Sequence, residues 1–393
     1  MSKITCRSKK QFLIKYCSLL LIFTSFFFVL PQSTACAAEF ADKVDAKSAI
    51  LMEASSGRVL FEQNADEALP PASVTKIMTL LLCMEAYDEG KIKLSDMVTV
   101  SEHAASMGGS QVYLEAGEQM SFEDMLKSVV VSSANDAAVA LAEHLAGSEA
   151  SFVAMMNQRA SELGMNNTNF ENTNGLDDNV VEHLTSARDI AIMSRELLKH
   201  EQILKYTSIW QDTIRDGAFT LSNTNRLIRF YEGANGLKTG STSKAGFCIS
   251  ATAKREDMQL ICVIMGSPTR DIRNAEAKKL LDYGFANYAV YKYAPEKLGQ
   301  IGVLGGTENS AEIQSRAFEC ILEKGKKSKV EVSYEYDQSI SAPIANGQRI
   351  GRVIFTCDGA VIGECEIVSV TEVNKISFLD ILKRIFVKMT SLF

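Results

Sequence analysis

Residues 70–87 read PPASVTKIMTLLLCMEAY, and this stretch sets the architecture of the first half of the chain. Pro70 and Pro71 end the element before them, because proline cannot continue a helix or donate to a sheet. The apolar residues that follow recur at helical spacing, and a serine stands at their start. The pattern predicts a helix over residues 73–87, with Ser73 at its N-terminus.

A hairpin precedes this helix and a helical block follows it. Two apolar runs between residues 48 and 62 flank Ser55-Ser56-Gly57, which is typical of a β-hairpin. Residues 95–200 have a helical pattern, in which Ser121-x-x-Asp124 resembles a capping box and Gly147 ends an alanine-rich segment. We therefore expect an all-helical insert after the hairpin.

Strand patterns return after residue 217 and lead into a last helix. The expected strands and helix are residues 238–242, 247–253, 260–265 and 275–288. A sheet that is interrupted by a helical block and closed by helices is an α+β fold. We expect it to occupy residues 38–293 as one domain.

Residues 296–372 differ in pattern from the first domain. Short alternating runs occur at residues 330–336, 352–357 and 361–368, and Asp358-Gly359 between the last two is a strong hairpin signal. These runs predict a separate, β-rich C-terminal domain.

Residues 375–393 predict an amphipathic helix, because the apolar residues from Phe378 to Phe393 recur at steps of three and four. The segment carries four positive charges and one negative charge in an otherwise acidic protein. Such a helix suits an anionic lipid surface, so we expect an interfacial membrane anchor. A helix packed on the β domain is the alternative.

Residues 1–37 predict a secretory signal peptide. They contain five basic residues and no acidic one, and the 14-residue apolar run at 17–30 is followed by Ala35-Cys36-Ala37. This run is short against the roughly 20 residues that cross a bilayer. A lipoprotein signal at Cys36 is a weaker alternative, since Ser33 stands where such signals usually carry leucine. We expect an exported protein at the outer face of the cytoplasmic membrane.

Charge and cysteine content exclude several function classes. Without the five basic residues of the signal peptide, the 41 basic residues fall to 36 against 48 acidic ones, which argues against a nucleic-acid partner. The six cysteines that remain form no Cys-x-x-Cys pair and have no histidine cluster nearby. We therefore find no metal site, expect no cofactor, and expect mostly buried thiols.

Ser73 and Lys76 are the first candidates for chemistry. A serine hydroxyl becomes a good nucleophile only when a base takes its proton, and residues three apart on a helix share one face. A lysine amine can be that base if burial and nearby positive charge lower its pKa. The pattern alone is weak evidence, because Ser241 and Lys244 repeat it in a polar turn that has no helix to align them.

Two further motifs single out the first pair. Ser133-Ala134-Asn135 falls between two helical segments, where a turn can direct a hydroxyl and an amide into a cleft. Lys238-Thr239-Gly240 lies on a predicted strand. There a lysine can stabilise charge, a threonine can bind a carboxylate, and a glycine lets a substrate approach the backbone. Each motif alone also has an ordinary structural explanation, as a helix cap or an exposed strand lysine.

Together these motifs resemble the Ser-x-x-Lys, Ser-x-Asn and Lys-Thr-Gly set of the penicillin-recognising serine enzymes. Within them, the chain is most similar to the low-molecular-mass penicillin-binding proteins, the serine-type D-alanyl-D-alanine carboxypeptidases. The resemblance extends over most of the chain after the signal peptide. It includes residues 49–57, 71–79, 108–110, 174–176, 185–189 and 236–240, the β domain and the amphipathic tail.

The resemblance implies a β-lactamase-like catalytic domain and a reaction. Ser73 would form the acyl-enzyme with the stem peptide of peptidoglycan and release its terminal D-alanine. Lys76 would take the serine proton, and Ser133 would complete proton transfer beside Asn135, which positions the substrate. β-Lactam antibiotics would act as inhibitors at the same serine.

The resemblance also implies how the terminal carboxylate and the oxyanion are bound. Lys238 and Thr239 would engage the carboxylate, and Gly240 would border the substrate. Backbone N–H groups of Ser73 and Ser241 would form an oxyanion hole. We add Arg270, which follows the last predicted strand, as a further carboxylate partner.

Three other interpretations compete with this one. A Ser-His-Asp triad is disfavoured, because the four histidines have no Gly-x-Ser-x-Gly elbow to serve, and His183 is expected to fix the loop before Thr185. A class A-like β-lactamase would use an acidic loop residue, for which Glu171 is a candidate at the wrong spacing from Asn174. A penicillin-sensing or wall-binding protein that acylates without turnover is the third.

Overall fold

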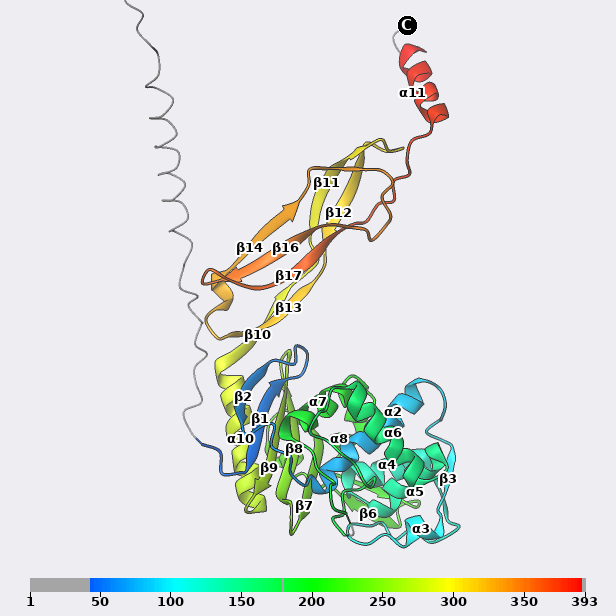
Figure 1. The fold of residues 1–393 in the computed structure, drawn as a ribbon, viewed down its shortest axis with the longest axis vertical. Helices are drawn as coiled ribbons and strands as arrows, with labels where there is room; N and C mark the ends of the chain where they lie inside the picture. The colour runs from blue at the N-terminus through cyan, green and yellow to red at the C-terminus, as the bar shows by residue number, and fades with distance from the viewer. Residues whose placement is uncertain (1–42, 179, 391–393) are drawn as a thin grey trace, which may run out of the picture. The chain divides into compact units, whose positions relative to one another are not determined.

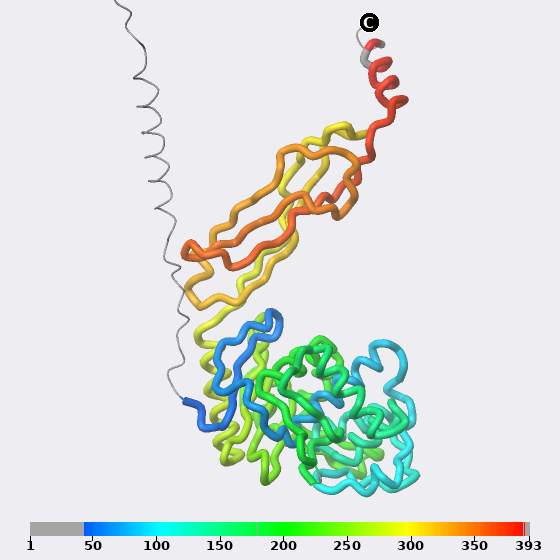
Figure 2. The backbone as a smooth tube through the Cα atoms, in the orientation of Figure 1, coloured from blue at the N-terminus to red at the C-terminus, as the bar shows by residue number. Residues whose placement is uncertain are grey.

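The structure is a computed structural model that describes residues 43–178 and 180–390, so the predicted signal peptide lies outside the described residues. Its first part is built on a five-stranded antiparallel sheet in the order β2-β1-β9-β8-β7 (Figure 1). The strands are β1 (Ser48–Glu53), β2 (Val59–Gln63), β7 (Ala234–Thr242), β8 (Gly246–Arg255) and β9 (Met258–Ser267). The predicted N-terminal hairpin is thus β1 and β2, drawn in blue in Figures 1 and 2.

Helices cover the sheet on both faces. α10 (Arg270–Asn287) packs on β8 and β9, and α7 (Ala187–Leu197) packs on β9 and β1 (Figure 1). Successive side chains of a strand point to opposite faces, so both faces of a covered sheet must be apolar. In β9, Leu260 lies against Gly284 of α10, whereas Ile261 belongs to the core shared with the helical part.

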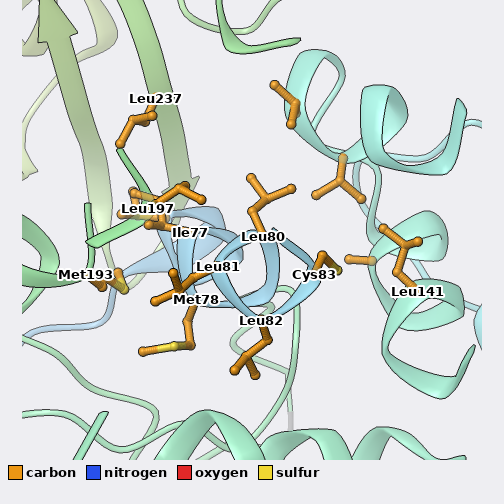
Figure 3. Close-up of a cluster of buried hydrophobic side chains, with 14 of the residues drawn as sticks. Ile77, Met78, Leu80, Leu81, Leu82, Cys83, Leu141, Met193, Leu197 and Leu237 are labelled. Carbon is orange, nitrogen blue, oxygen red and sulfur yellow. The ribbon is translucent and has the colours of Figure 1, made fainter. Parts of the chain in front are cut away.

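The helical part surrounds α2 (Lys76–Asp88), whose residues 76–84 are all buried. A helix that is buried all round is central rather than amphipathic. Figure 3 shows its apolar side chains between Leu141 of α5 (Asn135–Ala146) and Met193 and Leu197 of α7. The other helices are α3 (Glu102–Ala105), α4 (Phe122–Val131), α5 (Asn135–Ala146), α6 (Glu149–Glu162), α8 (Ile203–Thr207) and α9 (Leu227–Phe230).

The predicted caps are confirmed. The side chain of Ser121 accepts a hydrogen bond from the N–H of Asp124 at the start of α4. Gly147 ends α5 with a φ of +77°, in the left-handed region that glycine enters without steric cost.

Several elements differ from those predicted, and the expected all-helical insert is not purely helical. The helical block contains the two-stranded sheet β3 (Met97–Thr99) and β4 (Gln119–Ser121), and β5 (Gln211–Ile214) and β6 (Phe219–Ser222) follow it. These strands are too short to show an alternating pattern in sequence. Ser73 lies in a 3-10 turn, Ala72–Thr75, that leads into α2. α10 begins five residues before the predicted start, because the Thr269 side chain caps it.

The C-terminal part is β-rich, as predicted. Its six-stranded sheet has the order β14-β16-β17-β12-β11-β15, and a separate pair is formed by β10 and β13. Asp358 and Gly359, both with positive φ, make the two-residue turn between β16 and β17. The strands are β10 (Tyr288–Tyr293), β11 (Lys297–Leu304), β12 (Ser310–Ser315), β13 (Phe318–Glu323), β14 (Val330–Tyr336), β15 (Ser339–Ser341), β16 (Arg349–Cys357) and β17 (Ala360–Ser369).

The last helix is α11 (Phe378–Thr390), and large apolar side chains are exposed along it. Phe378 is 76% exposed and Phe386 is 70% exposed. Within residues 43–178 and 180–390, no helix has the length and apolar character needed to span a membrane. Six cysteines of the described chain are free thiols, four of them buried and two partly buried.

Candidate active site

Ser73 and Lys76 are brought together by the turn that starts α2. Pro71 precedes the turn, Ala72 has a φ of +49°, and the hydroxyl of Thr75 donates to the carbonyl of Ala72. This compact backbone places Lys76 Nζ 3.0 Å from Ser73 Oγ. The predicted pair therefore lies within hydrogen-bond distance.

Lys76 is completely buried and has two further contacts, both with carbonyl oxygens. Its Nζ donates to Asn135 Oδ1 at 2.6 Å and to the main-chain oxygen of Asn174 at 2.8 Å. Burial, followed by the charge of Lys238, holds the pKa of Lys76 well below its ordinary value, although Asp136 opposes the shift. The amine is thus suited to accept a proton at neutral pH.

The Ser-x-Asn motif forms the turn between α4 and α5. Ser133 has a φ of +62°, which is uncommon for a non-glycine residue. Asn135 is the first residue of α5, and its Nδ2 donates to the carbonyl of Gly108 at 2.7 Å. The same amide thus accepts from Lys76 and ties the 108–110 segment to the site.

The Lys-Thr-Gly motif lies on β7, as predicted. Lys238 Nζ donates to Ser133 Oγ at 2.9 Å, and burial, followed by the charge of Arg273, lowers its pKa to about 7. The hydroxyl of Thr239 donates to that of Thr224 at 2.8 Å. A Cβ at Gly240 would lie 2.8 Å from the nitrogen of Ser73, so only glycine fits beside the nucleophile turn.

The three motifs meet at a cleft of about 180 Å³. Its lining residues come from the turn before α2, the 108–110 segment, the α4–α5 turn, the segment between β6 and α9, β7 and the start of α10. They are Ser73, Ser110, Ser133, Thr224, Thr239, Gly240, Ser241, Arg270 and Arg273. Lys76 and Asn135 lie behind this lining, in contact with each other. The second Ser-x-x-Lys pair is not assembled, since Lys244 Nζ donates to the main-chain oxygen of Asp177.

The cleft includes residues that sequence reasoning did not assign. Arg273 is 2% exposed and donates to the carbonyl of Cys248, whereas Arg270, three residues earlier on α10, is exposed. Recognising Thr269 as a helix cap would have placed both arginines in the first turns of α10, on one face. Ser110 lies in the 108–110 stretch of the family resemblance but was given no role, and Thr224 carried no signal in the sequence.

The other candidates from the sequence lie apart from Ser73 or act on the backbone. The Glu171 carboxylate accepts from the N–H groups of Val181 and Glu182, so it caps its own loop. His183 is 5% exposed and contacts Thr75. The remaining histidines have other neighbours: His103 contacts Glu149, His144 packs on Phe122, and His200 contacts Asp88.

An aromatic pair is connected through the backbone to the segment that holds Thr224. The N–H of Asn223, the neighbour of Thr224, donates to the carbonyl of Trp210. The Trp210 ring meets Phe230 edge-on at 6.1 Å, and the guanidinium of Arg229 lies over it at 5.7 Å. Trp210 is the one tryptophan of the chain.

Comparison with known proteins identifies the family. The profile of the D-alanyl-D-alanine carboxypeptidases matches residues 34–269, and that of the C-terminal domain of penicillin-binding protein 5 matches residues 291–375. The chain belongs to the D-alanyl-D-alanine carboxypeptidase family. This carboxypeptidase is 44% identical to DacF of Bacillus subtilis, with 86% of this chain and 89% of DacF covered. It is 35% identical to DacC of Escherichia coli, with 90% and 91% covered.

Solved structures support the same assignment. The carboxypeptidase is similar to penicillin-binding protein 5 of Haemophilus influenzae, with a TM-score of 0.75, 35% identity, and 85% of this chain and 99% of that chain covered. It is also similar to penicillin-binding protein D2 of Listeria monocytogenes in its ampicillin-bound form, with a TM-score of 0.57 and 32% identity. That match covers 62% of this chain and 98% of the other. The predicted fold class and enzyme family are thereby confirmed.

Proposed function

We propose that this carboxypeptidase removes the terminal D-alanine from peptidoglycan stem peptides through an acyl-enzyme on Ser73. The observation that carries the proposal is the set of contacts made by Lys76 Nζ. A neutral amine has two N–H groups and one lone pair. Because two carbonyl oxygens take the N–H groups, the lone pair is directed at the Ser73 hydroxyl, which can then donate its proton.

Acylation follows from this arrangement. As Lys76 takes the proton, Ser73 Oγ attacks the carbonyl carbon of the penultimate D-alanine, and the carbonyl oxygen becomes an oxyanion. Backbone N–H groups of Ser73 and Ser241 would bind that oxygen; the close packing of Gly240 on the Ser73 nitrogen supports this location. The C–N bond then breaks, and the leaving amine of D-alanine receives the proton from Lys76 by way of Ser133. Water, activated by Lys76, later hydrolyses the ester.

The cationic end of the cleft suits the terminal carboxylate of the substrate. Lys238 lies under the cleft and contacts Ser133, and the hydroxyl of Thr239 lines it. Arg273 and the exposed Arg270 add positive charge at the same end. We assign the carboxylate to this group, with Asn135 positioning the peptide carbonyl nearer to Ser73.

β-Lactam antibiotics would acylate the same serine, since the similar Listeria protein was solved in an ampicillin-bound form. The engagement of Glu171 with its own loop argues against the β-lactamase alternative, because this carboxylate does not line the cleft. Penicillin is therefore expected to inhibit the enzyme rather than to be its substrate.

One assay separates these functions. The protein lacking its tail is incubated with a peptide that ends in D-Ala-D-Ala and, separately, with benzylpenicillin. D-Alanine release together with a long-lived penicilloyl adduct on Ser73 is expected, and Ser73→Ala should abolish both. Rapid penicillin turnover without peptide cleavage would instead identify a β-lactamase, and a stable adduct without D-alanine release would identify a sensor.

We further propose that the chain is exported and held at the outer face of the membrane by α11, that residues 38–293 carry catalysis, and that residues 296–372 form the β-rich domain that lies between them in the sequence. The exposed apolar side chains of α11, such as Leu382 at 54% and Phe386 at 70%, support insertion into a lipid interface. Lys383 and Arg384 supply positive charge for anionic headgroups.

Vesicle binding tests the anchor. The mature chain should co-sediment with vesicles that contain phosphatidylglycerol, less with phosphatidylcholine alone, and a chain ending at Lys375 should stay in the supernatant. Lys383→Glu should weaken binding to the anionic vesicles. If the full and shortened chains sediment equally, α11 is not the anchor.

A further inference from the structure

The loop of residues 171–176 is attached to the nucleophile turn and α2 at three points. The carbonyl of Asn174 accepts from Lys76, and that of Thr173 accepts from the Thr79 hydroxyl at 2.6 Å. The third connection runs through His183, which lies outside the loop and contacts both sides. The position of the Asn174 carbonyl, and hence the orientation of the Lys76 amine, depends on these attachments.

The contacts of His183 define its tautomer. The N–H of Glu171 donates to His183 Nδ1 at 2.9 Å, so that nitrogen carries no proton. His183 Nε2 therefore carries the proton and donates to the hydroxyl of Thr75 at 2.8 Å. The Thr75 hydroxyl in turn donates to the carbonyl of Ala72. Each hydrogen bond in this series therefore has a defined donor and a defined acceptor.

The surroundings of His183 favour this neutral form. The ring is 5% exposed and packs edge-on against Phe170 at 5.8 Å. Burial lowers the pKa of His183 to about 4, against the opposing effect of the Glu171 charge. A charged imidazolium would have to donate from both nitrogens, and the Glu171 N–H could then no longer bind to Nδ1.

We propose that His183 is a positioning residue for acyl transfer, which clamps the 171–176 loop to the nucleophile turn and so holds the Asn174 carbonyl where it orients the Lys76 amine. A hydrogen bond from His183 to Thr75 can fix the nucleophile turn, because Thr75 lies between Ser73 and Lys76 in that turn. The inference rests on the proposed role of Lys76 as the base.

The test compares acylation by benzylpenicillin in variants of the mature chain. His183→Phe keeps an aromatic ring but loses both hydrogen bonds, and Thr75→Val loses only the hydroxyl. Each should lower the acylation rate constant roughly 10- to 100-fold, since small misplacement of a catalytic group has effects of this size. The penicillin concentration at half-saturation should stay within about threefold, because neither side chain lines the cleft.

Two further variants separate positioning from plain stability. His183→Gln can accept from Glu171 and donate to Thr75, so it should restore acylation to within about threefold of the wild type. The double variant of His183→Phe and Thr75→Val should be no slower than the slower single variant, because both break one chain of contacts. His200→Phe, which changes a histidine that contacts Asp88, is the matched control and should leave acylation unchanged.

The proposal is overturned if folded His183→Phe acylates at the wild-type rate, or if His183→Gln is as slow as His183→Phe. Additive effects in the double variant would also overturn it. Rates are normalised to the fraction of protein that a labelled penicillin titrates, so loss of folded protein does not imitate a slow step. Failure of the proposed function would show differently, as a wild type that releases no D-alanine.

Discussion

At the residue scale, Lys238 shows that burying an ionisable amine in the active site lowers the stability of the fold. Its pKa falls from 10.5 to about 7 on folding, mainly through burial. The unfolded chain therefore binds more protons than the folded chain between these values, and stability rises with pH across this window. Below about pH 7 burial of the charged Lys238 lowers the free energy of unfolding by its full amount, on the order of a few kcal/mol.

We predict that Lys238→Met stabilises the protein at pH 7 while it abolishes D-alanine release. The free energy of unfolding should rise by about 2 kcal/mol. Removing the buried charge stabilises the protein by more than this, but the loss of the hydrogen bond to Ser133 offsets part of the effect. Denaturant unfolding at pH 7 and at pH 10 measures it, and the difference between variant and wild type should shrink at the higher pH. A gain that is independent of pH would point to packing instead.

At the scale of elements, the loop that follows α6 matters as much as α2. A Cβ at Gly175 would lie 1.8 Å from the carbonyl oxygen of Ala72, and its φ is +83°. No side chain fits there unless the loop withdraws from the turn, and withdrawal would remove the Asn174 carbonyl from Lys76.

Gly175→Ala is therefore predicted to slow penicillin acylation by roughly 100-fold or more. Gly164→Ala is the matched control, because Gly164 has a similar φ of +73° but nothing within 4 Å of the added Cβ. The control should lose only about 1 kcal/mol of stability and keep its acylation rate. Acylation reactions quenched at successive times measure the rate of each variant, and thermal melts measure its stability. Equal acylation rates for Gly175→Ala and Gly164→Ala would contradict the prediction.

Elements with a local signal were predictable from the sequence, and contacts made by the backbone were not. The serine helix, the turn that holds Ser133 and the strand that holds Lys238 each carry a pattern of apolar spacing or turn residues. The Asn174 carbonyl carries none, since every residue has a carbonyl and long-range packing decides which one meets Lys76. The role of Glu171 as a loop cap was hidden for the same reason.

At the scale of the whole molecule, a solved relative of almost complete coverage matches only part of this chain. The Listeria protein D2 aligns over 98% of its own length with only 62% of this chain. The sheet and the helical part also share one hydrophobic core. The buried residues of this core lie between Ile50 and Met265, and none of them comes from the C-terminal strands.

A mature chain that ends after α10, at Asn287, is accordingly predicted to cleave a soluble D-Ala-D-Ala peptide with kcat/KM within about threefold of the full chain. Its activity on intact cell-wall sacculi beside anionic vesicles should fall, because α11 is missing. Released D-alanine measures both reactions. A truncated chain that folds but loses activity on the soluble peptide would show that the C-terminal part supports the cleft.

The position of the single tryptophan makes the enzyme its own optical probe. Trp210 is joined through Asn223 to Thr224 at the rim of the cleft, and its ring lies beside a guanidinium whose distance affects emission. An acyl group on Ser73 that displaces Thr224 should change the indole fluorescence in real time, without any label. Trp210→Phe should acylate normally but show no change in indole fluorescence. If so, the fluorescence of the wild type would allow turnover to be followed on unmodified cell-wall fragments.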